Sequence, residues 1–179
     1  MSDAQPSVLR AGFSMARTAV RVRRPRPRSG QAAPSHDGLA EALTALARRG
    51  PSAIGDIDGL LAEYMAEIAV VDPNALDADD ALAHWINVYN AGALRLAARA
   101  DREGSDSVLR IPGAFSSPFL TVADEPLSLD GIEHGKIRRF GDPRIHGALV
   151  CGSVSCPTLR AEPFVGPALD AQLDDQLRA

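Results

Sequence analysis

The chain has 179 residues, of which 45% are hydrophobic and 4% aromatic, and its formal net charge is −4. This length suffices for one domain with a hydrophobic core, which aliphatic side chains must build because aromatic ones are scarce. No window approaches the ~18 apolar residues of a membrane span, and no apolar segment typical of a signal peptide follows the N-terminal charges. We therefore expect no membrane partner and, by default, a cytoplasmic protein with reduced cysteines.

Residues 1–35 differ in charge from the rest of the chain. They carry seven arginines and one acidic residue, whereas the other 12 Lys and Arg face 22 acidic residues. Proline and arginine dominate the stretch Arg21–Arg28, which disfavours packing and offers no aromatic ring for stacking on bases. We interpret residues 1–35 as a disordered basic leader without a nucleic-acid partner, followed by a single domain over residues 37–179.

Apolar residues at helical spacing predict five helices in this domain. The first ends at Gly50, and Ser128 is the expected N-cap of the fourth. One apolar run, Ile145–Cys151, is typical of a buried strand, and a second short strand is expected near Val108–Ile111. The predicted helices cover residues 37–49, 56–71, 77–101, 128–140 and 167–179.

The C-terminal part of the sequence contains only one convincing strand, which cannot form a sheet by itself. A single strand would leave its backbone groups unpaired, and no Gly or Pro stops the last helix. We therefore expect an α+β domain whose helical N-terminal half packs on a small sheet around Ile145–Cys151, and whose C-terminal end is truncated.

The helix predicted over residues 77–101 carries polar residues on two arcs. His84 lies opposite the apolar face, so we expect it to be solvated. Asn87 and Asn90 share another arc with apolar neighbours, where amides need hydrogen-bond partners. Two interpretations stay open: these amides hold a neighbouring loop, or one of them holds a substrate or orients a catalytic group.

The helix predicted over residues 128–140 places a carboxylate on its apolar side. Glu133 is either part of a half-buried pair with Lys136, or an acid, base or orienter of a histidine. His134 lies at the rim of the same face, where a cleft could reach it.

The region around the two cysteines is the strongest candidate for chemistry. Cys151 stands where the apolar run ends at Gly152, and a thiol nucleophile needs a nearby base. His146 lies five residues earlier, which in a straight strand is roughly 16 Å away on the opposite face. A base for Cys151 therefore comes more plausibly from another element, and His134 is available. The alternative is that Cys151 is a small buried residue, with Cys156 either a resolving thiol or a space-filling side chain.

A zinc site is the other chemistry that these residue types allow. His134, His146, Cys151 and Cys156 are four zinc-type ligands, but their spacing is loose and two of them point apart along a strand. We predict no metal and no cofactor.

Three segments of the sequence, residues 83–91, 127–135 and 142–159, resemble successive signatures of the domain of unknown function 547 family. The resemblance covers about residues 37–179 and implies that the family domain continues beyond the last helix; many bacterial relatives are exported. Plant relatives often have serine at the position of Cys156, which favours Cys151 as the important thiol. The matching positions are Trp85, Asn87, Tyr89, Asn90, Glu133, His134, His146, Cys151 and Ser155.

These observations lead to two functional hypotheses. The first is a cysteine-dependent hydrolase or acyl transferase that acts on an amide or ester of a small molecule or peptide. Cys151 is its nucleophile, His134 or His146 its base, and Glu133 orients that base. The second is a non-catalytic protein-interaction module whose polar residues form a buried network. In the first hypothesis the substrate contacts come from Asn87, Asn90, Tyr89 and Ser155.

Overall fold

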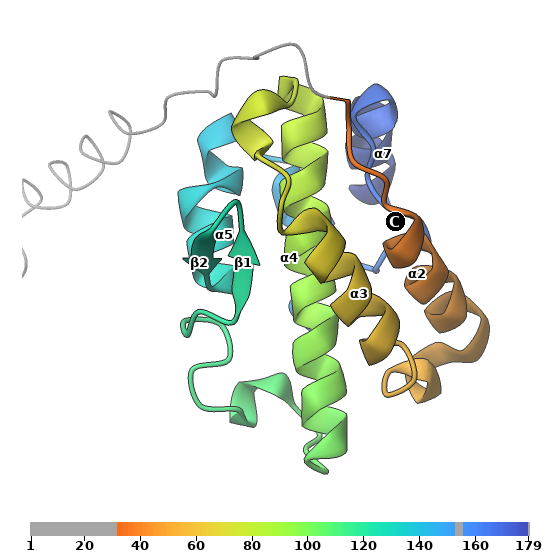
Figure 1. Cartoon of the computed structure of the whole chain (residues 1–179). Coiled ribbons are helices and arrows are strands. Elements are labelled where there is room, and N and C mark those ends of the chain that lie inside the picture. Colours follow the sequence, from red (N-terminus) through yellow and green to blue (C-terminus); the bar gives the residue numbers. More distant parts are fainter. Residues whose placement is uncertain (1–31, 153–155, 179) are drawn as a thin grey trace, which may run out of the picture.

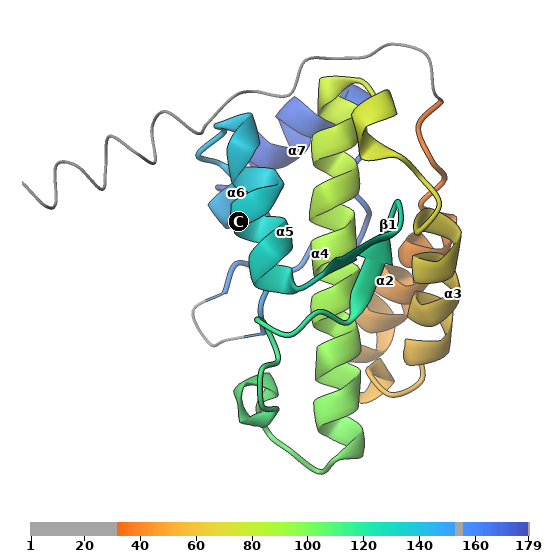
Figure 2. The same ribbon diagram turned by 60° about the vertical axis from the view of Figure 1, so that its left-hand side comes forward.

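A central helix organises the computed structural model, which describes residues 32–152 and 156–178. This helix, α4 (Ala78–Arg102), has α2 (Asp37–Arg49) and α3 (Asp58–Ile68) along one side (Figure 1). The other side, on the left in Figure 1, carries α5 (Leu129–Gly135) and a β-hairpin. Near the N-terminal end of α4 lie α6 (Ile145–Ala148) and α7 (Leu169–Gln176) (Figure 2). Short 3₁₀ turns cover Gly50–Ala53, Pro73–Ala75, Val108–Arg110, Ile137–Phe140 and Gly166–Ala168.

The hairpin supplies the strands of this α+β fold. β1 (Leu120–Val122) pairs antiparallel with β2 (Glu125–Leu127). The two turn residues, Ala123 and Asp124, have φ angles of 49° and 62°, which suit the twist of a tight hairpin. The Ala123 N–H also donates to the Ala69 carbonyl at 2.7 Å, so the turn is fixed to the chain that follows α3. The predicted fold class is thus confirmed, with a smaller sheet in a different place.

Local signals explain where several helices begin and end. α2 has the predicted bounds, and Gly50 ends it with a φ of 65° that glycine adopts at no steric cost. The Ser128 hydroxyl caps α5 by accepting the Gly131 N–H at 3.0 Å, as expected. The predicted helix over residues 128–140 is broken at Lys136 into α5 and a 3₁₀ turn.

Two strand predictions are wrong. Residues 145–148 form the short helix α6, and Leu149, which ends it, has extended backbone angles. Val108–Arg110 forms a 3₁₀ turn in place of a strand. An apolar run of about seven residues fits a buried strand and a buried irregular segment equally well, because both hide the same side chains.

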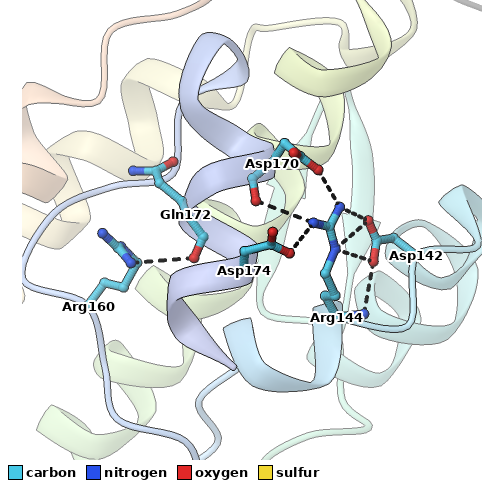
Figure 3. Close-up of polar contacts among 6 residues, drawn as sticks. All are labelled: Asp142, Arg144, Arg160, Asp170, Gln172 and Asp174. Carbon is cyan, nitrogen blue, oxygen red and sulfur yellow. Dashed lines mark hydrogen bonds and ion pairs between the residues drawn. The ribbon is translucent and has the colours of Figure 1, made fainter. Parts of the chain in front are cut away.

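Arg144, at the start of α6, forms ion pairs with three aspartates, two of which lie on α7 (Figure 3). Its guanidinium lies 2.8 Å from carboxylate oxygens of both Asp142 and Asp170, and 2.6 Å from Asp174. The side chain is about one-quarter exposed, so these charge-assisted bonds are partly shielded from water. The turn before α6 is therefore held directly against α7.

The middle of α4 is buried on all sides, because elements pack around its whole circumference. Gly92 shows how close they come: a Cβ atom there would lie 3.0 Å from side-chain carbons of Leu120 and Leu129. The absence of a side chain at Gly92 lets β1 and α5 approach the α4 backbone.

His84 is fully buried in this packing, so the prediction that it is solvated is wrong. Its ring centroid lies 6.3 Å from that of His36 and 5.7 Å from that of Trp85. Neither ring nitrogen has a hydrogen-bond partner among the described residues. Burial lowers the pKa of His84 to about 3, with a further contribution from His36, whose own pKa burial lowers to about 4. Both rings are therefore neutral in the fold near neutral pH.

Truncating a core side chain on α4 should cost much more stability than truncating an exposed one. Ile86 is completely buried, whereas Val70 is 85% exposed. We expect Ile86→Ala to lower the free energy of unfolding by about 2–5 kcal/mol and Val70→Ala by less than about 0.5 kcal/mol. Urea unfolding followed by circular dichroism measures both. Equal losses in the two variants would contradict the central position of α4.

The buried His84 should make the fold sensitive to acid. The unfolded histidine has a pKa of about 6.5, and the folded one about 3. Between these two pKa values the unfolded chain binds a proton that the folded chain does not. The stability that neutral His84 contributes is therefore fully present above pH 6.5 and is lost as the pH falls. A plot of the free energy of unfolding against pH should have a positive slope between pH 4.5 and pH 6. We expect His84→Phe to reduce this slope by up to about 1.4 kcal/mol per pH unit. An unchanged slope in the variant would show that His84 protonates freely in the fold.

Candidate functional site

Asn90 on α4 fixes the backbone that leads to Cys151. Its amide nitrogen donates to the Ala148 carbonyl at 2.9 Å, and its amide oxygen accepts the Val150 N–H at 3.0 Å. These are the two bonds that a neighbouring strand would supply, so one buried side chain takes the place of a strand at this point. The position of Cys151 therefore depends on α4.

Three more buried amides hold the chain that follows Cys156. Asn87 pairs with both backbone groups of Phe164, at 2.8 and 2.9 Å. Gln172 on α7 donates to the Pro163 carbonyl at 3.0 Å and accepts the Val165 N–H at 2.9 Å. Gln176, one turn later, donates to the Thr158 carbonyl. We call these four side chains the carboxamide clamps: Asn87, Asn90, Gln172 and Gln176.

The geometry of Asn87 and Asn90 distinguishes between their two interpretations. Each uses both its amide oxygen and its amide nitrogen on the protein's own backbone. Both are at most 5% exposed, which leaves little surface for a substrate. The structure thus shows them holding neighbouring segments.

The two cysteines are half-buried and lie side by side. Their Sγ atoms are 2.8 Å apart, and both residues are thiols that are not joined in a disulfide. The Cys151 N–H also donates to Cys156 Sγ at 3.1 Å. The segment between them turns at Gly152, whose φ of 81° lies in the region that favours glycine.

Tyr89 on α4 lies within electrostatic range of Glu133 and of both cysteines. Burial raises the pKa of the Tyr89 phenol, and interactions with Glu133, Cys151 and Cys156 raise it further. Tyr89 is therefore a neutral hydroxyl near neutral pH.

Glu133 is paired differently from the sequence expectation. Its Oε1 accepts from Arg138 at 2.7 Å, whereas Lys136 forms an ion pair with Glu125. The ammonium of Lys136 also lies 5.5 Å from the centroid of the Trp85 ring, a cation–π distance. The expected Glu133–Lys136 pair is thus wrong, because the helix breaks at Lys136 and its side chain follows a different direction.

Both candidate bases lie at the surface. His134 is exposed on α5, and its Nδ1 contacts the Asp130 carbonyl at 3.1 Å, one turn earlier. His146 is exposed on α6, which replaces the buried strand position expected for it. Ser155 lies outside the described residues.

A groove of about 630 Å³ has Gly152, the residue after Cys151, in its lining. Its walls are mostly apolar side chains of α2 and α4, such as Leu46 and Leu94. Arg160 and Asp101 add charge at the lining. Concave, mostly apolar surfaces with a few polar groups are the usual form of small-molecule sites.

The described residues contain neither a cluster of metal-binding side chains nor a helix that could cross a membrane. Within residues 32–152 and 156–178, no three His, Cys, Asp or Glu side chains are grouped so that they could hold a metal ion. None of the helices described for this chain combines the length and apolar character that crossing a membrane requires.

Comparison with known proteins places the chain in a family. Residues 73–179, more than half of the chain, match the family model described as "Protein of unknown function, DUF547". The chain belongs to this family. The match confirms the resemblance seen in the three sequence segments and includes every residue of the candidate site in this DUF547 protein. No match is found among curated proteins or among solved structures.

Sequence reasoning missed two of the four clamps. Gln172 and Gln176 lie in the predicted last helix, where a spacing of four residues places both amides on one face. That spacing was a usable signal, because two buried glutamines on one face need backbone or side-chain partners.

Removing a clamp should weaken the fold more than removing an exposed asparagine. We expect Asn87→Ala and Asn90→Ala each to lower the free energy of unfolding by about 1–3 kcal/mol, because each leaves a backbone donor and acceptor unpaired. The control is Asn74→Ala, an exposed residue that bonds only to Asp72, with an expected change below about 1 kcal/mol. Calorimetry of the three variants measures these values. Losses in the clamp variants no larger than in the control would contradict the clamps.

Proposed function

We propose that this DUF547 domain is a cysteine-dependent hydrolase or acyl transferase that acts on an amide or ester, with Cys151 as the nucleophile. The observation that carries the proposal is the placement of one half-buried thiol. Asn90 fixes the backbone immediately before Cys151, and Gly152, immediately after it, is one of the residues that line the groove. A thiol on a fixed backbone one residue from a concave surface supports covalent acyl transfer, which needs a positioned nucleophile near a substrate site.

In this proposal the reaction has two steps, acylation of Cys151 and transfer of the acyl group to water or an amine. The Cys151 sulfur attacks the carbonyl carbon, a C–S bond forms, and the C–N or C–O bond to the leaving group breaks. The departing amine or alcohol takes the proton that the base removed from the thiol. Water or an acceptor amine then attacks the thioester, releases the acyl group and returns the proton to Cys151.

The neighbouring side chains have separate roles in this proposal. His134, whose ring is exposed on α5, is the first candidate base, and His146 is the second. Glu133 is the candidate orienter of the base, and both bonds that it accepts from Arg138 go to Oε1. Tyr89 is a neutral hydroxyl that donates to the substrate carbonyl, because burial and nearby negative charge raise its pKa. Asn87 and Asn90 act by positioning the backbone.

The second candidate is a non-catalytic protein-interaction module. The clamps favour it, because all four buried amides are used on the protein's own backbone. In this alternative the polar network shapes the surface around the groove, and Cys151 has no covalent role.

An acylation experiment with p-nitrophenyl acetate tests the catalytic proposal. With protein kept fully reduced, we expect an acetyl group on Cys151, detected by peptide mass spectrometry, with saturating kinetics and a rate at least about tenfold above that in 8 M urea. Cys156→Ser is the matched control and should retain the reaction, whereas Cys151→Ser should lose it. Acetylation that is no faster in the folded protein than in urea would reject the catalytic proposal and favour the module.

The candidate base has its own prediction. His134→Gln should slow hydrolysis of the acetyl-enzyme by about 10²–10⁴-fold, the usual contribution of a general base, without changing the circular dichroism spectrum. His146→Gln serves as the comparison, because both rings are exposed and only one is needed. Deacylation at the wild-type rate in both variants would exclude an imidazole base.

A further inference from the structure

The two thiols lie at a distance from which a bond between them is easily formed. Cys151 Sγ and Cys156 Sγ are 2.8 Å apart, and the sulfurs of a disulfide are about 2.05 Å apart. A small rotation of the two side chains therefore suffices. Both residues are thiols in this structure and half-buried, so a small reagent can reach them.

The backbone on each side of the pair is anchored to a different helix. Asn90 on α4 bonds both Ala148 and Val150, directly before Cys151. Gln176 on α7 donates to the Thr158 carbonyl, two residues after Cys156. The approach of the sulfurs is thus imposed by helices that pack against each other.

A backbone donor faces the Cys156 sulfur. Cys156 Sγ accepts the Cys151 backbone N–H at 3.1 Å. A donor at this position stabilises negative charge on the sulfur that it faces, so it favours a thiolate at Cys156.

We propose that Cys151 and Cys156 form a redox-active dithiol that closes reversibly to an intramolecular disulfide on reaction with a low-molecular-weight disulfide. The Cys156 thiolate attacks one sulfur of the small disulfide, a mixed disulfide forms, and one small thiolate leaves. The Cys151 thiolate then attacks the Cys156 sulfur, the protein disulfide forms, and the second small thiolate leaves. The protein loses two electrons and two protons, which the small disulfide gains as two thiols.

This site goes beyond the proposed acyl-transfer function and does not depend on it. The disulfide would block Cys151 as a nucleophile, so in a catalytic domain the same reaction would act as an off-switch. In a non-catalytic module the dithiol would still form. The redox experiment therefore measures thiol state alone and uses no ester substrate.

Equilibration of the full chain with reduced and oxidised glutathione tests the dithiol. After acid quenching and alkylation, mass spectrometry separates the dithiol, the mixed disulfide and the protein disulfide. We expect the protein disulfide to predominate over the mixed form, with an equilibrium constant at least about tenfold larger in the folded protein than in 8 M urea. A predominance of mixed disulfide, or equal constants in the two states, would overturn the proposal.

Two single variants check that both sulfurs are needed. Cys151→Ser leaves Cys156 alone, Cys156→Ser leaves Cys151 alone, and each should stop at the glutathione adduct, with similar equilibrium constants in the folded protein and in 8 M urea. The equilibrium measurement in the wild-type chain decides whether the pair is a dithiol. A tenfold gain on folding in either single variant would show that one thiol alone causes it and would contradict the dithiol.

Discussion

Backbone groups without a strand or helix partner are the constraint on which this structure depends. Much of the described chain between α6 and α7 has no regular secondary structure, yet Leu149 and Phe164 are buried. Buried N–H and C=O groups must be bonded, and here side-chain amides from α4 and α7 bond several of them. The carboxamide clamps thus hold this region without a sheet.

The chemistry of the site follows from the same arrangement. Both cysteines lie on the irregular segment, one after the Asn90 clamp and the other before the Gln176 clamp. Arg144 adds a third tie between this region and α7 through its acidic partners. The distance between the sulfurs is therefore a consequence of helix packing. Any change that separates α4 from α7 should change the thiol pair as well.

The helices could be predicted from the sequence, but the way that the cysteine region is held could not. Helical spacing and Gly50 predicted α2 with its observed bounds. The apolar run before Cys151 contains the same residues whether its partner is a strand or an asparagine, and spacing alone does not reveal the partner. His84 was misplaced because α4 was treated as a one-sided surface helix, although small residues such as Gly92 on its other faces indicate close neighbours.

Residue-specific hydrogen exchange tests the clamps most directly. The measured quantity is a ratio of two protection factors against exchange. It divides the protection factor of the Val150 amide, which bonds to Asn90, by that of the Phe164 amide, which bonds to Asn87. The ratio cancels a global loss of stability, which affects both amides. The account predicts that Asn90→Ala lowers this ratio by at least about tenfold and that Asn87→Ala raises it by a similar factor. An unchanged ratio in both variants would contradict the claim that side-chain amides hold this backbone.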